Sequence, residues 1–589
     1  MTEQRDRPPG RRPYDPDATV VLPVGPPPTN ADDAPTVVVD GPTVVLPTVP
    51  AEVTGETTSV ARNSATMAVG SMVSRVTGFL RTAVIGAAIG AGAVSDDYNL
   101  ANTLPNMVYE LLLGGVLASV IVPLLVRARS TDTDRGEAYT QRLLTLGTAF
   151  LAGATLLAVL CAPLLTDVVA NAHTPSADRH LITVLGYLLL PEIFFYGLAA
   201  LVSAVLNTRG HFAAPMWTPI LNNVVVILTA VVFLLLPSAG LRADTLSTAQ
   251  ILTLGVGTTL GIVVQAAGLW PALHRVRFHW RWRWDAHALG LRELGRVGGW
   301  MLAYVVVSQI GLVVVLKLAK LAGDRAGPGP AIYLNAFLIF MMAHGIVAVS
   351  VITALMPRMS AAAVEGRYST VAEQLSLGTR LSAVILVPAT AAYLVLGRPL
   401  AVTLFEWGHY THQQALATGP VIAIAGLGLV PFAIRQLQIF AFYAMPDTKT
   451  PALVNVPVVI LRSAVDILFY VMLPAGLVAA GLMGGNGVSY VFGLAVGYWL
   501  LRRKLGRLGL RRLLDTLVRL GVAALVACVP AGLIVLVVHH LLGDHKGGSA
   551  VQLVVGGAVL LAAYLAGALM LQVREIRELG GMVRGRLGR

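Results

Sequence analysis

Long apolar segments recur along this chain from about Met67 to the C-terminal region, and they constrain its fold more than any other feature. The hydrocarbon core of a bilayer is about 30 Å thick, and an α-helix needs about 20 apolar residues to cross it. We count fourteen segments of about that length. Runs such as 553–571 are continuously apolar, whereas the strands of a membrane barrel alternate apolar and polar residues. The sequence therefore predicts an all-α polytopic membrane protein with about 14 transmembrane helices.

The basic residues are unevenly distributed over the predicted loops. The net charge of +12 would suggest a nucleic-acid partner in a soluble protein. Here most Lys and Arg residues fall in the even-numbered loops and the C-terminal tail, including two dense groups: Arg275, Arg277, Arg281, Arg283, Arg292 and Arg296, then Arg502, Arg503, Lys504, Arg507, Arg511 and Arg512. Basic loops face the cytoplasm. We therefore expect both termini in the cytoplasm and no nucleic-acid partner.

No enzymatic motif accompanies these segments. The sequence has no HExxH motif, phosphate-binding glycine loop or His/Cys cluster, and its two cysteines, Cys161 and Cys528, each lie within an apolar segment. His539, His540 and His545 lie beside a predicted extracytoplasmic turn without a matching set of carboxylates. We therefore expect no cofactor, no metal and no covalent chemistry.

Residues 1–63 are rich in Pro, Thr, Asp and Val and contain no apolar segment long enough to be a signal peptide, which predicts a disordered cytoplasmic tail. A Thr-Val-Val motif occurs three times in this tail, at Thr19, Thr36 and Thr43. A phosphate on such a threonine adds up to about two negative charges, which an Arg-lined pocket of a forkhead-associated domain would bind. One interpretation is thus a site for a Ser/Thr kinase and a forkhead-associated partner; the other is a linker that binds nothing.

The membrane region shows signs of duplication. The segment 73–75 resembles 307–309, the segment 115–120 resembles 345–350, and the turn ending at Pro215 resembles the turn ending at Pro451, all with a period of about 230 residues. Six helices per repeat keep the orientation, so the repeats are parallel and the substrate path lies between them. We expect an N-lobe at 64–290, a C-lobe at 291–505, and two extra helices with a basic tail at 506–589.

Charged residues inside spanning segments are costly and usually face a cavity or a partner. Arg75 and Arg81 in the first helix lie about 120° apart around the helix axis, among small residues that allow a bulky group to approach: Ser71, Ser74, Gly78 and Gly86. A guanidinium binds phosphate through two hydrogen bonds and keeps its charge. We expect both to line one cavity for a pyrophosphate; the alternative is that each is snorkelling or salt-bridged.

The remaining intramembrane charges are Glu110, Glu192, Lys317, Arg435, Arg462 and Asp466. Arg462 and Asp466 are i, i+4 neighbours, which favours a pair within one helix. Arg435 follows Pro431, a helix breaker, so a position lining the cavity is one interpretation of it.

Short motifs along the chain resemble those of the MurJ (MviN) family. The sequence Ser74-Arg75-Val76-Thr77-Gly78-Phe79-Leu80-Arg81 is similar to the family's first-helix signature of Ser-Arg, Gly-Phe and a second Arg. Further matches occur in the family's order: Gly90-Ala91-Gly92, Asp96, Leu104-Pro105-Asn106, Val122-Pro123, Leu206-Asn207-Thr208, Asn222, Ser308-Gln309-Ile310, Phe442-Tyr443 and Asp447-Thr448-Lys449-Thr450-Pro451. The resemblance extends from about Ser64 to about Arg503.

This resemblance implies the fourteen-helix fold of the multidrug/oligosaccharidyl-lipid/polysaccharide exporter superfamily, in the bacterial cytoplasmic membrane. The implied substrate is lipid II, the undecaprenyl-pyrophosphate-linked peptidoglycan precursor, which moves from the inner to the outer leaflet by alternating access. Arg75 and Arg81 fall on the family's two functional arginines of the first helix. We expect the return of the empty carrier to be coupled to the membrane potential or to a cation.

The chain also departs from the family pattern. Tyr109-Glu110 and Gly114-Gly115 replace a basic pair and a Glu-Gly, and Phe337-Leu338 replaces an Asp-Arg pair. Either residues such as Lys317 and Arg435 substitute for the missing charges, or the headgroup is held differently. The alternatives are a flippase for another polyprenyl-linked glycan, a scaffold that recruits cell-wall regulators through its tail, and a cation-coupled drug exporter, against which the two arginines argue.

Overall fold

The computed structural model describes residues 56–111, 124–125, 128–129, 132–171, 174–237, 240–285, 291–506 and 508–577. The chain divides into two compact units, Met1–Val60 and Ala61–Arg589, and the helical bundle belongs to the second. The threonines Thr19, Thr36 and Thr43 lie outside the described residues. Helix α1 begins at Glu56, so the last eight residues of the predicted tail are helical. Throughout the described ranges the secondary structure is helical and contains no strand, which confirms the all-α class.

The first group of helices corresponds to the predicted N-lobe. Its members are α1 (Glu56–Ile89), α2 (Ala93–Glu110), α4 (Glu137–Leu160), α5 (Ala162–Val169), α6 (Ser176–Leu189), α7 (Glu192–Thr208), α8 (Ala213–Leu235), α9 (Thr248–Ala267) and α10 (Trp270–Arg275). Helix α8 packs on α9, α4 on α7, and α2 on α6, while α9 also contacts α6 and α7. Gly90 makes the turn from α1 to α2 with a φ of +71°, a conformation that favours glycine.

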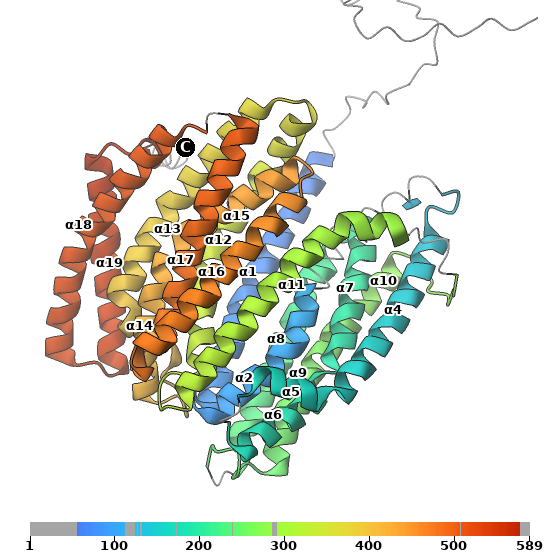
Figure 1. Ribbon diagram of the computed structural model, residues 1–589, viewed down its shortest axis with the longest axis horizontal. Helices are drawn as coiled ribbons and strands as arrows, with labels where there is room; N and C mark the ends of the chain where they lie inside the picture. The colour runs from blue at the N-terminus through green and yellow to red at the C-terminus, as the bar shows by residue number, and fades with distance from the viewer. Residues whose placement is uncertain are drawn as a thin grey trace, which may run out of the picture. The chain divides into compact units, whose positions relative to one another are not determined.

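The second group contains α11 (Leu291–Gly323), α12 (Pro330–Val364), α13 (Tyr368–Phe405), α14 (His412–Leu427), α15 (Leu429–Ala444), α16 (Lys449–Met472) and α17 (Ala475–Leu505). Helices α14 and α15 are consecutive and bend by 46° at Gly428. The last pair, α18 (Leu510–Leu542) and α19 (Lys546–Met570), pack on each other and on α13. Figure 1 shows this pair at the edge of the helical bundle, as expected for an addition to a duplicated core.

By length and composition, eleven helices among the described residues are able to cross a membrane, or twelve if the bent pair is one span. Two further long helices fall short of this criterion. Helix α2 carries Asp96, Asp97 and Glu110, and the shorter apolar stretch of α12 covers Pro330–Gly345. The structure thus confirms a multi-pass membrane protein, while the number fourteen and the orientation of the termini stay predictions.

The predicted duplication has an atomic counterpart. In the first group, the Asn223 amide on α8 donates to the Ser74 carbonyl (3.2 Å) and to the Thr77 hydroxyl (2.9 Å) on α1. In the second group, the Asn455 amide on α16 donates to the Tyr304 carbonyl (3.0 Å) and to the Ser308 hydroxyl (2.8 Å) on α11. Each residue lies 230 to 232 positions from its counterpart. The same polar contact therefore fixes the first helix of each group to the fifth span of that group.

The two groups meet through few helices. Helix α2 contacts α11 and α12, and α5 contacts α11. Helix α1 also bridges the groups, because Gly70 lies against Trp217 of the first group and Gly86 against Tyr410 of the second. Among the described residues, the interface thus involves mainly α1, α2 and α5 on one side and α11, α12 and the segment before α14 on the other.

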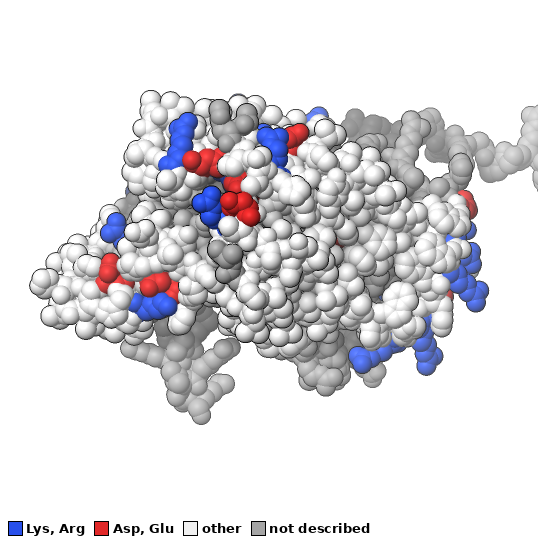
Figure 2. All heavy atoms as spheres, turned by 90° about the horizontal axis from the view of Figure 1, so that it is seen from below, with Lys and Arg blue, Asp and Glu red and all other residues white. Residues whose placement is uncertain are grey.

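Figure 2 shows the end of the molecule that lies at the bottom of Figure 1. Over most of this face Lys and Arg are few and lie beside Asp or Glu. This is the end where α1 finishes and α2 begins, so it is opposite to the start of α1. The sparse basic residues agree with the end of the molecule that the sequence predicts to be extracytoplasmic.

Candidate functional site

A polar cavity of about 80 Å³ lies where the two groups of helices meet. Helices α1, α2, α7, α8 and α9 of the first group and α12 of the second contribute its walls. Its polar lining consists of one arginine and many amides and hydroxyls: Arg81, Thr82, Ser95, Tyr98, Asn99, Asn102, Asn106, Tyr196, Asn222, Thr258 and Asn335. Such a wall of hydrogen-bonding groups inside a membrane protein indicates a site for a polar ligand.

Arg81 is the basic residue of this cavity. Its side chain is half-buried, and its Nε is buried without a hydrogen-bond partner. Glu192 at the start of α7 interacts electrostatically with it, is fully buried and accepts a hydrogen bond from the Thr259 hydroxyl (3.3 Å). Glu192 thus lies within electrostatic range of the guanidinium, while the Nε donor of Arg81 has no hydrogen-bond partner.

Neighbouring hydrogen bonds fix the amides of the cavity. The Asn106 amide donates to the Asn102 carbonyl (2.7 Å), and the Tyr196 hydroxyl donates to the Asn106 side-chain oxygen (3.3 Å). The side-chain oxygens of Asn102 and Asn222 are buried without a partner. The site therefore presents a free cationic donor beside free acceptors, which suits an anionic group that carries hydroxyls, such as a sugar phosphate.

Arg75 is placed differently from Arg81. It is exposed and does not line the cavity; its guanidinium instead lies against Gly345 of α12, where a Cβ atom would collide with it. His344 lies close enough for an electrostatic interaction with Arg75. The structure therefore places both predicted arginines at the boundary between the groups, but only Arg81 in the enclosed cavity.

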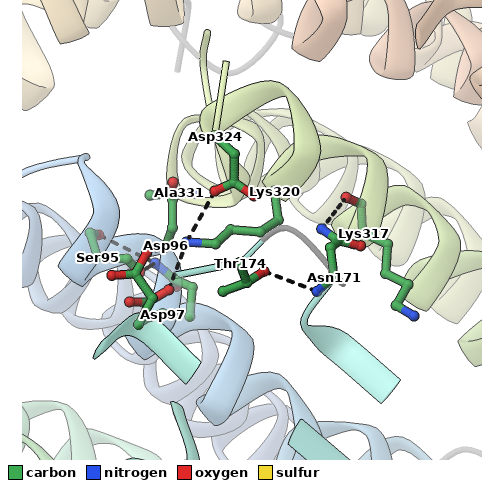
Figure 3. Close-up of polar contacts among 11 residues, drawn as sticks. Ser95, Asp96, Asp97, Asn171, Thr174, Lys317, Lys320, Asp324 and Ala331 are labelled. Atoms are coloured by element: carbon green, nitrogen blue, oxygen red, sulfur yellow. Dashed lines mark hydrogen bonds and ion pairs between the residues drawn. The ribbon is translucent and has the colours of Figure 1, made fainter. Parts of the chain in front are cut away.

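The structure does not bring Arg435 and Lys317 to this cavity. Arg435 is buried in the second group, where its guanidinium donates to the Asn455 side-chain oxygen (2.8 Å). Lys317 on α11 is half-buried, and its carbonyl accepts from the Asn171 amide (3.4 Å). In Figure 3 the Lys317 ammonium points away from the neighbouring ionic cluster. A pyrophosphate-binding role for these two residues stays a prediction, because this conformation does not bring them to the cavity.

A buried ionic cluster closes the boundary between the groups at one end (Figure 3). The Lys320 ammonium on α11 is 1% exposed and lies 2.8 Å from an oxygen of Asp97, 3.3 Å from Asp178 and 3.7 Å from Asp324. Asp97 belongs to α2 and Asp178 to α6, so the first group supplies two carboxylates and the second group supplies the cation. This arrangement ties α11 to α2 and α6.

Asp96 makes the adjacent contact between the groups. Its carboxylate accepts a hydrogen bond from the backbone N–H of Ala331 (2.8 Å) in the first turn of α12, where N–H groups have no partner within the helix. Gly329 allows this approach, because a Cβ there would collide with the Asp96 carboxylate. The sequence motifs indicated Asp96 but not the ionic cluster of Asp97, Asp178 and Lys320. The one signal in the sequence that could have indicated this cluster was a lysine, Lys320, inside an apolar segment.

The other motif residues occupy structural positions. Ser74 and Gly78 of α1 face Asn223 of α8, and Pro105 is buried inside α2. The side-chain oxygens of Asn207 and Gln309 are buried without a partner. Ser74, Gly78 and Pro105 thus serve helix structure and packing, and none of the five residues lines the cavity.

The turn before α16 holds a second set of motif residues. Asp447 accepts hydrogen bonds from the Thr450 N–H (2.9 Å) and hydroxyl (2.7 Å) and pairs with Lys504. Lys449 lies over the Trp300 ring, 5.5 Å from its centroid, and Pro451 is buried. This motif therefore fixes the start of α16 to the end of α17 rather than contacting the cavity.

The departures from the family pattern are also visible. The ring of Tyr109 packs 4.4 Å from that of Tyr196, whose hydroxyl bonds Asn106 of the cavity, and Glu110 is exposed. Phe337 stacks between Tyr333 and Phe340. Aromatic packing thus occupies the places of Tyr109 and Phe337, and Arg462 donates to the Tyr333 hydroxyl beside Phe337 (3.2 Å). Gly114 and Gly115 lie outside the described residues.

A sequence profile of the family described as lipid II flippase MurJ matches residues 85–549, which is most of the chain. The chain belongs to the MurJ family of lipid II flippases. Two curated relatives agree with this assignment. The probable lipid II flippase MurJ of Synechocystis sp. is 26% identical over 454 residues, 77% of this chain and 83% of that protein. The lipid II flippase MurJ of Burkholderia cenocepacia is 26% identical over 434 residues, 72% and 79% of the two chains.

Solved structures show the same fold as this MurJ-family chain. A lipid II flippase MurJ in an inward closed conformation matches with a TM-score of 0.67 and 17% identity, over 84% of this chain and 97% of that one. An inward-facing multidrug resistance MATE family transporter of the MOP superfamily matches with a TM-score of 0.57 and 15% identity, over 73% and 96%. The predicted family, superfamily fold and transporter class are thus confirmed. Arg75 and Arg81 precede the matched range, so their assignment depends on the first-helix motif and on the geometry of the boundary between the groups.

Proposed function

We propose that this protein moves lipid II from the inner to the outer leaflet of the bacterial cytoplasmic membrane, for cell-wall synthesis. The observation that carries the proposal is the cavity of Arg81, which presents a free guanidinium donor among amides at the boundary between two helix groups. A pyrophosphate is the part of lipid II that such a donor binds.

The size of the cavity supports an alternating-access mechanism. About 80 Å³ corresponds to a few water molecules at about 30 Å³ each. A disaccharide-pentapeptide headgroup is much larger, so the groups have to separate before it enters. The polyprenyl chain needs no such cavity, because it stays in the lipid throughout.

The ionic cluster at Lys320 acts in this mechanism as the contact that holds one end closed. It lies where α2 begins, opposite to the start of α1. With the N-terminus in the cytoplasm, as the basic loops predict, the closed end faces outward. Opening toward the outer leaflet then requires Lys320 to leave Asp97 and Asp178, and Asp96 to leave α12.

The return of the empty carrier is proposed to draw on the membrane potential or on a cation. One elementary charge crossing 100 mV gains about 2.3 kcal/mol. Arg81 lies at the boundary where the groups move against each other, so its charge changes its place in the electric field between the two states.

The tail is proposed to be a regulatory addition. Its three Thr-Val-Val motifs support phosphorylation of Thr19, Thr36 and Thr43 by a Ser/Thr kinase and binding of a forkhead-associated partner. Deletion of residues 1–55 is expected to abolish the binding of that partner and to leave transport in place. A scaffold, in contrast, would lose its whole function with the tail.

The decisive experiment is rescue of a strain depleted of its native lipid II flippase, with lipid II measured in each leaflet at matched protein abundance. We expect the parent chain to rescue and Arg81→Ala to leave lipid II in the inner leaflet. Arg81→Lys is expected to rescue in part, because lysine keeps the charge but lacks the two parallel donors. Arg242→Ala, an exposed arginine paired with Asp244, is the matched control and is expected to rescue fully.

Full rescue by Arg81→Ala would contradict the site while leaving the function standing. Failure of the parent chain, with the protein present in the membrane, would contradict lipid II as the substrate. Lipid II competition against a second polyprenyl-linked glycan would then distinguish the alternative flippase.

A further inference from the structure

The segment after α10 carries an alternating pattern of arginine and tryptophan. Residues 278–285 read Phe-His-Trp-Arg-Trp-Arg-Trp-Asp and form neither helix nor strand. The Trp280 and Trp282 rings stack with centroids 5.5 Å apart, and the Trp282 and Trp284 rings with centroids 6.0 Å apart. Trp270 at the start of α10 lies 6.4 Å from Trp280. Four indoles thus form a continuous row, which we call the tryptophan ladder.

Helix α4 holds this segment in place. The Gln141 amide donates to the His279 carbonyl (2.7 Å), and the Thr145 hydroxyl accepts from the Arg283 N–H (3.1 Å) and from the Trp280 indole (3.4 Å). The Arg283 side chain donates in turn to Gln141 (2.9 Å). These contacts fix the backbone, so the ladder is a built surface of the protein.

The ladder lies at the rim of the apolar surface of α4. Gln141 and Thr145 are in the first turns of this spanning helix, and Phe150, about 7.5 Å further along the axis, is 70% exposed with Leu157 one or two turns beyond. Figure 1 shows α4 and α10 at the edge of the molecule. The ladder thus lies where the lipid-facing surface of α4 gives way to its loop, which is the level at which tryptophans concentrate in membrane proteins.

The tryptophans are uncovered although their rings are large. Trp282 is 61% exposed and Trp284 is 66% exposed. An indole has an apolar body and one polar N–H, so it is stable at a membrane interface and poorly suited to bulk water. A partner that covers apolar ring faces is therefore required.

Among the described residues, the arginines around the ladder have no acidic partner. Arg275, Arg277 and Arg281 are exposed, and among the described residues none of them pairs with a carboxylate. Asp285, the acidic residue at the end of the segment, is 3.6 Å from Arg142 instead. Loop topology explains basic residues at this end of the molecule, but it does not explain their interleaving with a stacked row of indoles.

We propose that the tryptophan ladder and Arg275, Arg277 and Arg281 form a binding surface for anionic phospholipid headgroups of the adjacent leaflet. The indoles lie at the interface against glycerol and upper acyl groups, and the guanidiniums bind the headgroup phosphates. The surface is distinct from the Arg81 cavity and does not depend on the identity of the transported substrate. Because the segment leads into α11, the first helix of the second group, bound lipid anchors the first group beside the connection between the groups.

The test counts lipids bound to the full-length protein by native mass spectrometry. Detergent-purified protein is titrated with phosphatidylglycerol, with phosphatidylcholine and with inorganic phosphate. Each arginine of the surface should raise the affinity for an anionic lipid about fivefold, as expected from about 1 kcal/mol per charge. We therefore expect phosphatidylglycerol to bind at least tenfold more tightly than phosphatidylcholine.

Two triple variants separate the surface from net charge. Arg275→Gln with Arg277→Gln and Arg281→Gln is expected to abolish the preference for phosphatidylglycerol. Arg502→Gln with Arg511→Gln and Arg512→Gln removes the same charge from exposed positions elsewhere and is expected to keep the preference. Trp282→Ala with Trp284→Ala is expected to weaken the binding of both lipids, because the rings contact parts that the two lipids share. The substituted side chains are exposed, so the thermal midpoint of each variant should equal that of the parent.

Equal loss of preference in both triple variants would overturn the proposal in favour of a diffuse charge effect. An unchanged preference in the first variant would overturn it directly. Displacement of the bound lipid by inorganic phosphate at equal concentration would show a simple anion site and would also overturn it.

Discussion

Removal of the Lys320 ammonium should open the end of the protein that its ionic cluster closes. In Lys320→Met the apolar stem stays but the charge is lost, so Asp97 and Asp178 lose the cation that lies 2.8 and 3.3 Å from them. Lys320 is 1% exposed and Asp97 is fully buried, so water does not replace the lost contact while this end stays closed. Breaking a buried ion pair by removing one partner costs about 3–5 kcal/mol. The closed state should therefore lose about 100-fold to several thousandfold in population relative to the open state.

This shift from the closed to the open state can be measured as the accessibility of the cavity to a thiol reagent. Ser95 lines the cavity beside the cluster and is 3% exposed. In a background with Cys161→Ser and Cys528→Ser, the Ser95→Cys thiol should react slowly with a membrane-impermeant maleimide added outside the cell, and rapidly once Lys320→Met is present. Lys317→Met, one turn earlier on α11, removes a lysine that has no acidic partner among the described residues, and it should leave the labelling unchanged.

Replacing both partners of a buried pair is far less costly than replacing one. Asp97→Asn together with Lys320→Met should therefore label more slowly than Lys320→Met alone. Unchanged labelling in Lys320→Met, in protein that still rescues growth, would refute the assignment of this cluster as the closing contact. Fast labelling in Lys317→Met would refute the specificity of the effect.

The contacts around the site lead to three more predictions. Gly329→Ala places a Cβ against the Asp96 carboxylate and should increase Ser95→Cys labelling, whereas Gly476→Ala, which has open space around it, should not. Asn223→Ala removes two hydrogen bonds and should cost about 1–3 kcal/mol, seen as a lower thermal midpoint of the purified protein. Asn455→Ala removes the two matching bonds and also the one from buried Arg435, so it should lower the thermal midpoint further. Partial burial raises the pKa of Asp447, but its bonds to Lys504 and Thr450 outweigh this and hold the pKa below its usual value. Its contribution to stability is thus present above the unfolded pKa of about 3.9 and lost as the pH falls through the folded pKa, so Asp447→Asn should show a smaller loss of thermal midpoint between pH 6 and pH 3 than the parent.

The sequence predicted the parts of this structure that depend on pattern along one chain. Apolar length predicts spans, so the all-α membrane class can be inferred without a structure. The helix count is harder, because α2 carries Asp96, Asp97 and Glu110 and fails a test of apolarity although it belongs to the bundle. Matching motifs at a fixed offset predicted the repeat, and the contacts of Asn223 and Asn455 give that repeat a physical form.

The parts that depend on contacts between distant segments were not predictable. Lys320 and Asp97 are 223 positions apart, and nothing local distinguishes Asp97, which pairs with lysine, from Asp96, which caps a helix. The Arg-Trp segment after α10 showed its charges in the sequence but not its stacking, since that requires α4 to hold the backbone in place. The structure places Arg75 and Arg81 in different surroundings, because two residues about 120° apart on one helix face different neighbours.

The repeat also explains why Arg435 is bonded inside its own group, whereas Arg81 keeps a donor without a partner. Asn223 and Asn455 make the same contacts to the first helix of their own group, but the side-chain oxygen of Asn455 additionally accepts a hydrogen bond from Arg435. Arg435 thus has a hydrogen-bond partner inside the second group. Moving Arg435 into a substrate site would leave the buried side-chain oxygen of Asn455 unpaired, which costs about 1–3 kcal/mol. Arg81 has no such bond at its Nε and faces a lining of amides. An anionic headgroup entering between the groups therefore gains most by binding Arg81, and transport through the second group's arginine would require breaking the contact that holds α15 to α16.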